Sequence, residues 1–327
     1  MNTDKKIDVT GIGNVLIDIL ARVTDEDIKN LGLTKGIMHL VGEEEQKTIL
    51  SYLKNINTEM EIGGACPNTI RCLAYLGRTT VLSGIVAKDE YGLHFSERVD
   101  KLKMVNRIAF GNDTITGTSI ILITPDGERT MNTNLGMCTR YSEKEVPEEE
   151  IKTSKYLFFT GYEWDTKNQI AAIRKASEIA KKNNTKIAFD LADPFCIKRN
   201  KDVFLEFLKT STDIVFANAN EAEMLIGKSL EENLKLLGEL VPIAVIKNGA
   251  EGSYIISEKK IARILANKVN AIDTTGAGDI YAGGFLAGLT RGYDLEKCGK
   301  IASLCAEEVI QQIGARLPEN LKQKIGE

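Results

Sequence analysis

Histidine is scarce in this chain. Only His39 and His94 occur among its 327 residues, and they lie far apart in the sequence. A catalytic triad built on histidine or a His-rich metal centre is therefore not expected. The six cysteines form no C-x-x-C pair, which argues against both a zinc site and a disulfide framework. We expect these cysteines to be reduced thiols in the protein interior.

Long apolar runs and an excess of basic charge are also missing. The sequence contains no apolar stretch of the roughly 18–20 residues that cross a bilayer, and its first residues lack the apolar segment of a signal peptide. The formal net charge is −4 without a basic stripe, which argues against nucleic-acid binding. We expect a cytoplasmic protein with a small-molecule partner, no nucleic-acid or membrane partner, and a monomeric or homodimeric state.

What the sequence does contain is an alternation of strand-like and helix-like segments. Apolar runs with strand character fall at 7–13, 79–83, 156–160, 186–190, 213–217 and 242–247. Segments with apolar residues at helical spacing include 67–76, 93–103 and 168–182. Strands separated by helices of this length predict a mainly parallel sheet with helices on both faces.

The alternation is broken in two places, at about 16–41 and about 107–135. In the second, Pro125-Asp-Gly127 is a turn signal between two β-rich runs, which predicts a hairpin. Such segments, inserted into an α/β core, could form a separate small sheet over an active site. With no linker or internal repeat, we expect residues 1–327 to form one domain that carries these insertions.

The segment Asp273-Thr-Thr-Gly-Ala-Gly-Asp279 carries the most chemical information. It follows a strand-like run at 263–272 and opens a helix-like run at 280–289. A glycine-rich turn at a helix start presents unpaired backbone N–H groups, which form an anion site. Beside it, the Asp279 carboxylate could act as a base, so the pair suits transfer of a phosphoryl group to a hydroxyl. The alternative is an ordinary helix start capped by Thr274 or Thr275, but a cap does not require Gly-Ala-Gly.

Two further features suit a hydroxylated ligand. Gly63-Gly-Ala-Cys-Pro-Asn68 places paired glycines before a helix, with Asn68 in the first turn as both donor and acceptor. Asp18 follows a core strand by a few residues and could bind a diol through both oxygens. The alternatives are a plain tight turn and a solvated carboxylate at a strand boundary.

Other motifs are individually weaker. Glu221 in Asn218-x-x-Glu221 could hold Mg²⁺ directly or through water, or could simply complete a capping box. A nucleotide could lie against the glycines of 247–252, although Asn-Gly is first of all a hairpin turn. Gly11-x-Gly13 lacks the third glycine of a dinucleotide fingerprint, since Leu16 stands there, so a dehydrogenase is a distant alternative. No P-loop motif occurs.

Taken together, the motifs resemble those of the ribokinase-like (PfkB) sugar and nucleoside kinases. Residues 273–286 are similar to the C-terminal signature of that family and residues 63–77 to its N-terminal signature. Asn218-x-x-Glu221 matches its Mg²⁺/phosphate motif, and Gly127-Glu-Arg-Thr130 matches a turn in its lid. The matches keep the order found in the family and extend from about residue 7 to about residue 316.

The resemblance implies a three-layer α/β/α Rossmann-like core with a small β-sheet lid, and transfer of the ATP γ-phosphate to a substrate hydroxyl with Mg²⁺. It also implies roles for particular residues. Asp279 would be the base, and Gly276, Ala277 and Gly278 the anion hole. Substrate would contact Asp18, Gly63, Gly64 and Asn68; ATP would contact Asn218, Lys247, Gly249, Gly252 and Thr274; Glu221 would organise Mg²⁺ through water; and Asp273 and Thr275, with backbone near Gly314, would bind a monovalent cation such as K⁺.

Within the family, segments 35–41, 161–165 and 191–196 look most like bacterial adenosine-kinase-like members. The 5′-hydroxyl of adenosine is therefore the expected acceptor. Its base would stack on Met38, Leu40, Tyr162 or Trp164, for which packing is the alternative role. A sugar or sugar-acid kinase remains an alternative, with Arg22 or Arg129 binding a phosphorylated substrate. A non-catalytic nucleoside- or nucleotide-binding protein is a more distant one.

Overall fold

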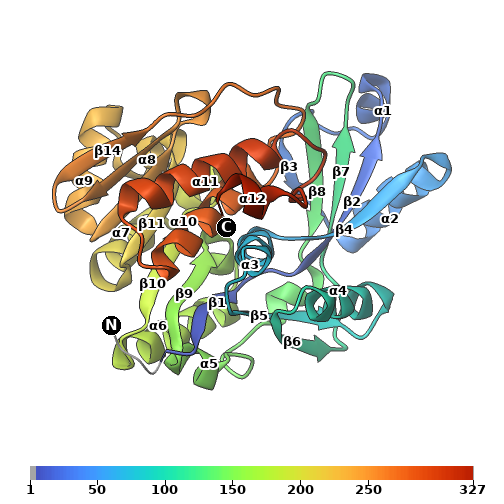
Figure 1. The fold of residues 1–327 in the computed structure, drawn as a ribbon. Coiled ribbons are helices and arrows are strands. Elements are labelled where there is room, and N and C mark those ends of the chain that lie inside the picture. The colour runs from blue at the N-terminus through green and yellow to red at the C-terminus, as the bar shows by residue number, and fades with distance from the viewer. Residues whose placement is uncertain (1–4, 327) are drawn as a thin grey trace.

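Two β-sheets form the framework of the molecule (Figure 1). The computed structural model describes residues 5–326. The larger sheet has nine strands in the order β14-β13-β12-β11-β10-β9-β1-β5-β6. From β12 to β6 all neighbouring strands are parallel, while β13 and β14 add an antiparallel edge. Its strands are β1 (Ile7–Ile12), β5 (Thr80–Ala87), β6 (Val105–Gly111), β9 (Ser154–Thr160), β10 (Lys186–Asp190), β11 (Ile214–Asn218), β12 (Ile243–Lys247), β13 (Ser253–Ser257) and β14 (Lys260–Ile264).

Alternating side chains in the central strands build a core on each face of this sheet. In β9, Phe158 belongs to one apolar cluster, whereas Leu157 and Phe159 belong to the other. This follows from the two-residue period of a strand, and it predicts helices on both faces. One face is covered by α3 (Ala65–Tyr75), α4 (Glu90–Lys101), α10 (Ala277–Thr290) and α11 (Leu295–Val309), with the short α12 (Leu321–Lys324) beside them. The other is covered by α5 (Glu148–Lys152), α6 (Lys167–Lys182), α7 (Pro194–Ser211), α8 (Ala219–Ile226) and α9 (Leu230–Leu240).

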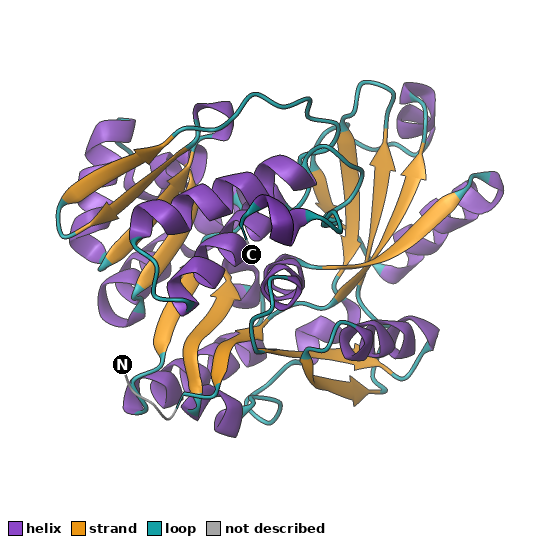
Figure 2. Ribbon diagram, in the orientation of Figure 1, coloured by secondary structure: helices purple, strands orange, loops and turns teal. Residues whose placement is uncertain are grey.

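The smaller sheet is the lid, and Figure 2 shows it as a separate group of strands beside the core. Its order is β3-β8-β7-β2-β4. The strands are β2 (Leu16–Arg22), β3 (Met38–Leu40), β4 (Thr58–Gly63), β7 (Thr118–Ile123) and β8 (Arg129–Asn134). The helices α1 (Asp25–Asn30) and α2 (Glu43–Tyr52) bury Ile28 and Ile49 in the same cluster as Ile17 and Ile19 of β2. One face of the lid is therefore packed, and the alternate residues point the other way.

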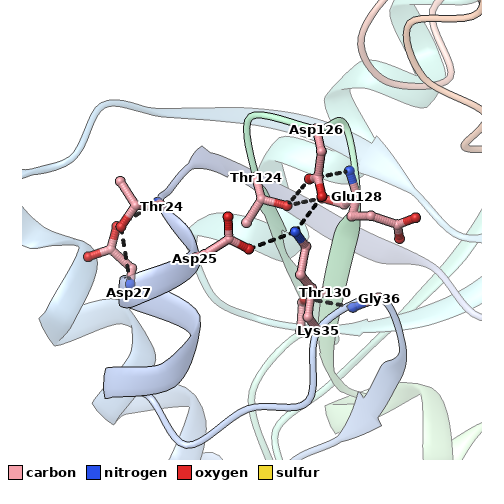
Figure 3. Close-up of polar contacts among 9 residues, drawn as sticks. All are labelled: Thr24, Asp25, Asp27, Lys35, Gly36, Thr124, Asp126, Glu128 and Thr130. Carbon is pink, nitrogen blue, oxygen red and sulfur yellow. Dashed lines mark hydrogen bonds and ion pairs between the residues drawn. The ribbon is translucent and has the colours of Figure 1, made fainter.

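At the lid tip, Lys35 forms ion pairs with two segments of the chain (Figure 3). Lys35 Nζ lies 2.6 Å from Asp25 Oδ1 in α1 and 2.5 Å from Asp126 Oδ2 in the β7–β8 turn. Asp126 also accepts from Thr124 Oγ1 at 2.7 Å. Because these carboxylates share one cation, α1 and the hairpin are held together although they are far apart in the sequence.

The structure confirms the three-layer core with a β lid, and it corrects the predicted boundaries. The predicted hairpin at Pro125-Asp-Gly127 is the β7–β8 turn. Residues 107–111 belong to β6 of the large sheet and not to the lid, and β4 is a lid strand that the sequence did not indicate. The strand predicted over 263–272 ends at Ile264. All six cysteines are buried and free, and no helix within residues 5–326 is long and apolar enough to cross a membrane.

Candidate functional site

A pocket lies between the lid and the carboxyl ends of the parallel strands. Its core side is formed by residues that follow β1, β9 and β10, and by the starts of α3 and α10. This is where parallel α/β sheets bind ligands, since the strand ends leave a crevice there. Its lid side is formed by the unpacked lid face. The lid residues are Leu16, Asp18, Met38, Leu40, Ser119, Ile121, Met131, Thr133 and Leu135.

The start of α10 has the geometry of an anion site. The N-cap is Gly276, whose φ of 68° is left-handed, and no side chain caps the helix. Ala277 N–H donates to Thr274 O, whereas the N–H groups of Gly276, Gly278 and Asp279 make no hydrogen bond to the described part of the chain. Free amides at a helix start attract a negative charge. The capped-helix alternative is therefore wrong, because neither Thr274 nor Thr275 supplies a cap.

Asp279 is the third residue of this helix, and two side chains of α3 donate hydrogen bonds to it. Asn68 Nδ2 donates to Asp279 Oδ2 at 3.0 Å, and Thr69 Oγ1 donates to the Asp279 carbonyl at 2.9 Å. Arg71 Nη2 in turn donates to Asn68 Oδ1 at 3.0 Å and so fixes the amide orientation. Burial raises the pKa of Asp279 to about 6, against the lowering effects of Asn68 and Lys247. A carboxyl in this range can accept a proton near neutral pH. Arg71 was not predicted, although it stands one helical turn after Asn68.

Asp18 lies on β2 of the lid and lines the same pocket as Asp279. A Cβ added to Gly63 would lie 2.2 Å from the Asp18 carboxylate, so only glycine leaves room for it. Gly64 has a φ of 101°, and a Cβ there would meet Asn14 O at 2.2 Å. Burial raises the pKa of Asp18 to about 7, while Arg71 and Arg129 lower it. The paired glycines thus do more than make a turn, because they bring Asp18 and Asn68 into one pocket.

A second group of charges lies beyond the anion site, at the ends of β10, β11 and β12. Lys247 Nζ is 3.0 Å from Asp190 Oδ2, in a pair whose side chains are 16% and 6% exposed. Glu221 is buried, and burial raises its pKa to about 7, against the lowering effect of Lys247. A Cβ on Gly278 would lie 3.0 Å from Lys247 Nζ, so the lysine reaches the underside of the α10 turn. The contribution of Asp190 was not predicted, because only the fold brings it next to Lys247.

The Glu221 carboxylate fits a water-mediated role toward Mg²⁺. Its Oε2 accepts from Asn218 N at 2.8 Å and its Oε1 from Asn218 Nδ2 at 2.7 Å, and Asn218 Oδ1 caps the helix in return. Each oxygen keeps a lone pair for a water. Residues 5–326 contain no cluster of three or more His, Cys, Asp or Glu side chains able to hold a metal. Mg²⁺ in proteins keeps several waters and is commonly shared with substrate phosphates, so oriented carboxylate oxygens such as those of Glu221 can bind its waters.

Asp273, Thr275 and Gly314, which were predicted to form a monovalent cation site, lie together in the structure. Asp273 Oδ1 accepts from Thr275 N at 2.8 Å, its Oδ2 accepts from Gly314 N at 2.7 Å, and Oδ2 also pairs with Arg129 of the lid. The Asp273 carboxylate therefore has two backbone N–H donors and the Arg129 guanidinium around it. The Arg129 side chain is only 11% exposed, and burial lowers its pKa to about 10.

The remaining predicted residues divide into two groups. Met38, Leu40 and Tyr162 line the pocket. Trp164 does not: it is 4% exposed and packs against Phe159, Phe189, Phe204 and Phe207, with ring centroids 5.1–5.8 Å apart. Its prediction as a base-stacking side chain is wrong, and the packing alternative is correct.

The glycines predicted to contact ATP lie in the β12–β13 hairpin. Gly249 has a φ of 54°, and Gly252 has a φ of 91°. A Cβ at residue 252 would lie 1.9 Å from Ile264 O. The hairpin therefore requires these glycines on its own account. Thr274 is exposed beside the α10 turn.

Comparison with known proteins places these features in one family. The profile described as pfkB family carbohydrate kinase matches residues 30–322. The fold is similar to the crystal structure of adenosine kinase from Sinorhizobium meliloti, with 35% identity, a TM-score of 0.92 and 98% of each chain covered. A probable sugar kinase protein from Rhizobium etli has 32% identity, the same TM-score of 0.92 and 98% coverage of each chain. Adenosine kinase of Saccharomyces cerevisiae is 27% identical over 94% of this chain and 96% of its own.

Proposed function

Because the chain belongs to the pfkB carbohydrate kinase family, we propose that it transfers the γ-phosphate of ATP to the 5′-hydroxyl of adenosine. The proposal rests on one observation. The Asp279 carboxylate lies beside the free backbone amides of the α10 turn, across a pocket from Asp18. A base beside an anion site serves phosphoryl transfer to a hydroxyl.

The chemistry requires one proton acceptor and one site for the transferred charge. Asp279 takes the proton of the 5′-hydroxyl while the hydroxyl oxygen attacks the γ-phosphorus. The bond from that phosphorus to the bridging oxygen of ADP breaks. The amides of Gly276, Gly278 and Asp279 receive the equatorial phosphate oxygens. Asp18 and Asn68 hold the ribose hydroxyls, Asn68 being fixed by Arg71. In this scheme α3 and α10 align the attacking oxygen with the anion hole.

The ATP side lies toward Asn218, Lys247, Gly249, Gly252 and Thr274. Lys247 carries a buried positive charge next to the α10 turn, with Asp190 as its fixed partner. Bound to the phosphates, Mg²⁺ would supply further neutralisation of their charge. Glu221 would hold water ligands of that ion, since its own oxygens are oriented by Asn218.

Adenosine is favoured by the apolar part of the pocket and by the Sinorhizobium meliloti neighbour, which is an adenosine kinase. Met38, Leu40 and Phe195 offer apolar surface to an aromatic base. A sugar acid is the second candidate, because Arg199 also lines the pocket and the Rhizobium etli neighbour is described as a probable sugar kinase.

An assay of ADP release over adenosine, inosine, ribose, fructose and a sugar acid tests the proposal. We expect adenosine to give the highest kcat/KM. We expect Asp279→Asn to bind ATP normally in calorimetry but to lose roughly 10²–10⁴-fold in kcat. Turnover of a sugar without turnover of adenosine would overturn the substrate assignment, and near-normal turnover by Asp279→Asn would overturn the assigned base.

A further inference from the structure

The pocket has a second polar end, formed by residues that the reaction scheme does not use. Asp165 follows the short helix Gly161–Trp164, and Asp193, Cys196 and Arg199 belong to the start of α7. The hydrogen bonds here join Arg199 to Asp165 and Cys196, whereas those of the reacting end join Asp279, Asn68 and Arg71. The two sets share no residue, so the pocket presents separate polar groups to the two ends of a ligand.

Asp165 is held in one orientation and keeps an open acceptor. Its Oδ1 accepts from Arg199 Nη2, and its side chain is 13% exposed. Its Oδ2 makes no hydrogen bond to any residue in the described part of the chain. Asp193 differs, because its Oδ1 accepts from Phe195 N at 2.6 Å and the side chain serves as the N-cap of α7. A partly buried acceptor without a partner carries a free-energy cost that a ligand N–H group would remove.

The walls around this acceptor suit a flat apolar ring. Leu40 on the lid and Phe195 on the core both line the pocket, and they are 53% and 49% exposed, so both offer apolar surface to a ligand. Met38 and Met131 pair across β3 and β8 on the same lid face. A ring between these walls would pair with Asp165 through an edge substituent that donates a hydrogen bond.

We propose that Asp165 is a specificity-determining residue that accepts a hydrogen bond from the 6-amino group of a purine nucleoside. The inference rests on the proposed adenosine kinase function and names the residue that selects its base. A 6-oxopurine in the same position would turn its carbonyl oxygen toward the carboxylate, and two acceptors repel each other. Arg199 acts as a positioning residue, since it holds Oδ1 and leaves Oδ2 to the ligand.

The test compares adenosine, inosine and purine riboside, which lacks a group at position 6. For the wild type we expect kcat/KM for adenosine to exceed that for purine riboside by roughly 10–100-fold, mainly through KM. Asp165→Asn keeps an oxygen for Arg199 and turns an NH₂ group toward the ligand. This variant should lose about the same factor with adenosine, gain activity with inosine and be unchanged with purine riboside.

Asp193→Asn is the matched control, since asparagine also caps helices and the same charge is removed from the same end of the pocket. It should leave the ratio of adenosine to purine riboside unchanged, and thermal midpoints of both variants check folding.

Equal use of adenosine and purine riboside by the wild type would overturn the inference without any variant. So would a parallel fall for both substrates in Asp165→Asn. Wild-type turnover of inosine but not adenosine also contradicts it, while leaving a nucleoside kinase in place. Turnover of a sugar but no nucleoside would overturn the proposed function as well.

Discussion

Lys247 is a single positive charge among three carboxyls, and that position decides what it does. Burial opposes its charge, but Asp190 and Glu221 raise its pKa, with a further contribution from Asp279. In return Lys247 lowers the pKa of Asp279 and of Glu221. Together with Asn68, the lysine thus favours the ionised form of the proposed base against the effect of burial.

Replacing Lys247 with methionine should move the acid limb of the activity profile. A base must be ionised to accept a proton, so wild-type kcat/KM should rise with pH through about 6, the pKa of Asp279. Without the lysine this pKa rises, and the limb shifts to higher pH, with a loss of roughly 10-fold or more in kcat at pH 6 and a smaller loss at pH 8. Rate profiles from pH 5 to 9 measure the shift. Lys247→Arg restores the charge and should restore the limb, and an unmoved limb in Lys247→Met would contradict the argument.

Gly63 is the second residue on which the site depends. In Gly63→Ala the new Cβ would lie 2.2 Å from the Asp18 carboxylate, which must move. The KM for the acceptor should rise roughly 10–100-fold, as expected when charged hydrogen bonds to substrate are lost, while the Kd for ATP should stay unchanged. Gly42→Ala is the matched control on the same lid, because its Cβ would meet only Glu45 Oε2 at an ordinary 3.7 Å. Equal KM values for the two variants would show that Asp18 does not hold the acceptor.

Among the elements, the hairpin at the lid tip shows what local sequence can predict. Pro125-Asp-Gly127 specifies its turn within a few residues. The partner of β4 is β2, some 40 residues earlier, and the sequence of β4 alternates weakly, so no local pattern indicated it. Beyond Ile264 the chain is still apolar, but β13 offers it no further partner. Ile272 and Asp273 instead donate to Ile310 O, and Leu265 and Ile272 remain exposed.

Lys35→Met should loosen the lid tip without unfolding the protein. The lysine bridges Asp25 of α1 and Asp126 of the hairpin, but exposed ion pairs add little to global stability. We expect faster amide exchange at Gly127 and Glu128, with a thermal midpoint within about 1 °C of wild type. Lys47→Met removes the same charge, yet among the described residues Lys47 pairs only with Glu43 and Glu44 inside α2. It should leave hairpin exchange unchanged, and equal exchange in both variants would contradict a bridging role for Lys35.

Over the whole molecule, the sequence predicted what periodic pattern and contiguous motif can carry. The three-layer core follows from alternating apolar segments, and the α10 anion site from seven consecutive residues. Arg71, Asp190 and the pairing of Arg129 with Asp273 could not be predicted, because each depends on segments that only the fold brings together. Trp164 was misplaced for a related reason: its neighbours in sequence line the pocket, and its own side chain turns into the core.

Building the site lowers the stability of the folded protein, because folding removes several carboxyl groups from water. Burial raises the pKa values of Asp18, Glu163 and Glu221 to about 7 and that of Asp279 to about 6. A folded-state pKa above the unfolded value means that the stabilising contribution is fully present below the unfolded pKa of about 4 and is lost as pH rises through the folded value. Above neutral pH, each such carboxyl therefore makes the fold less stable than its protonated form would.

Asp279→Asn should consequently be more stable than the wild type at pH 8 while being nearly inactive. Asparagine stands in for the protonated acid and can still accept from Asn68, so the gain is at most about 2–3 kcal/mol, or several °C in the thermal midpoint. The gain should shrink as pH falls from 6 to 4, where the wild-type carboxyl takes up its proton. Calorimetry at pH 8 and pH 4.5, without ligands, measures both differences. Asp126→Asn has the opposite sign, since Lys35 lowers the pKa of that carboxyl and its ionised form stabilises the fold. A lower thermal midpoint for Asp279→Asn than for the wild type at pH 8 would contradict this prediction. It would show that burial of the ionised Asp279 carboxylate does not destabilise the fold.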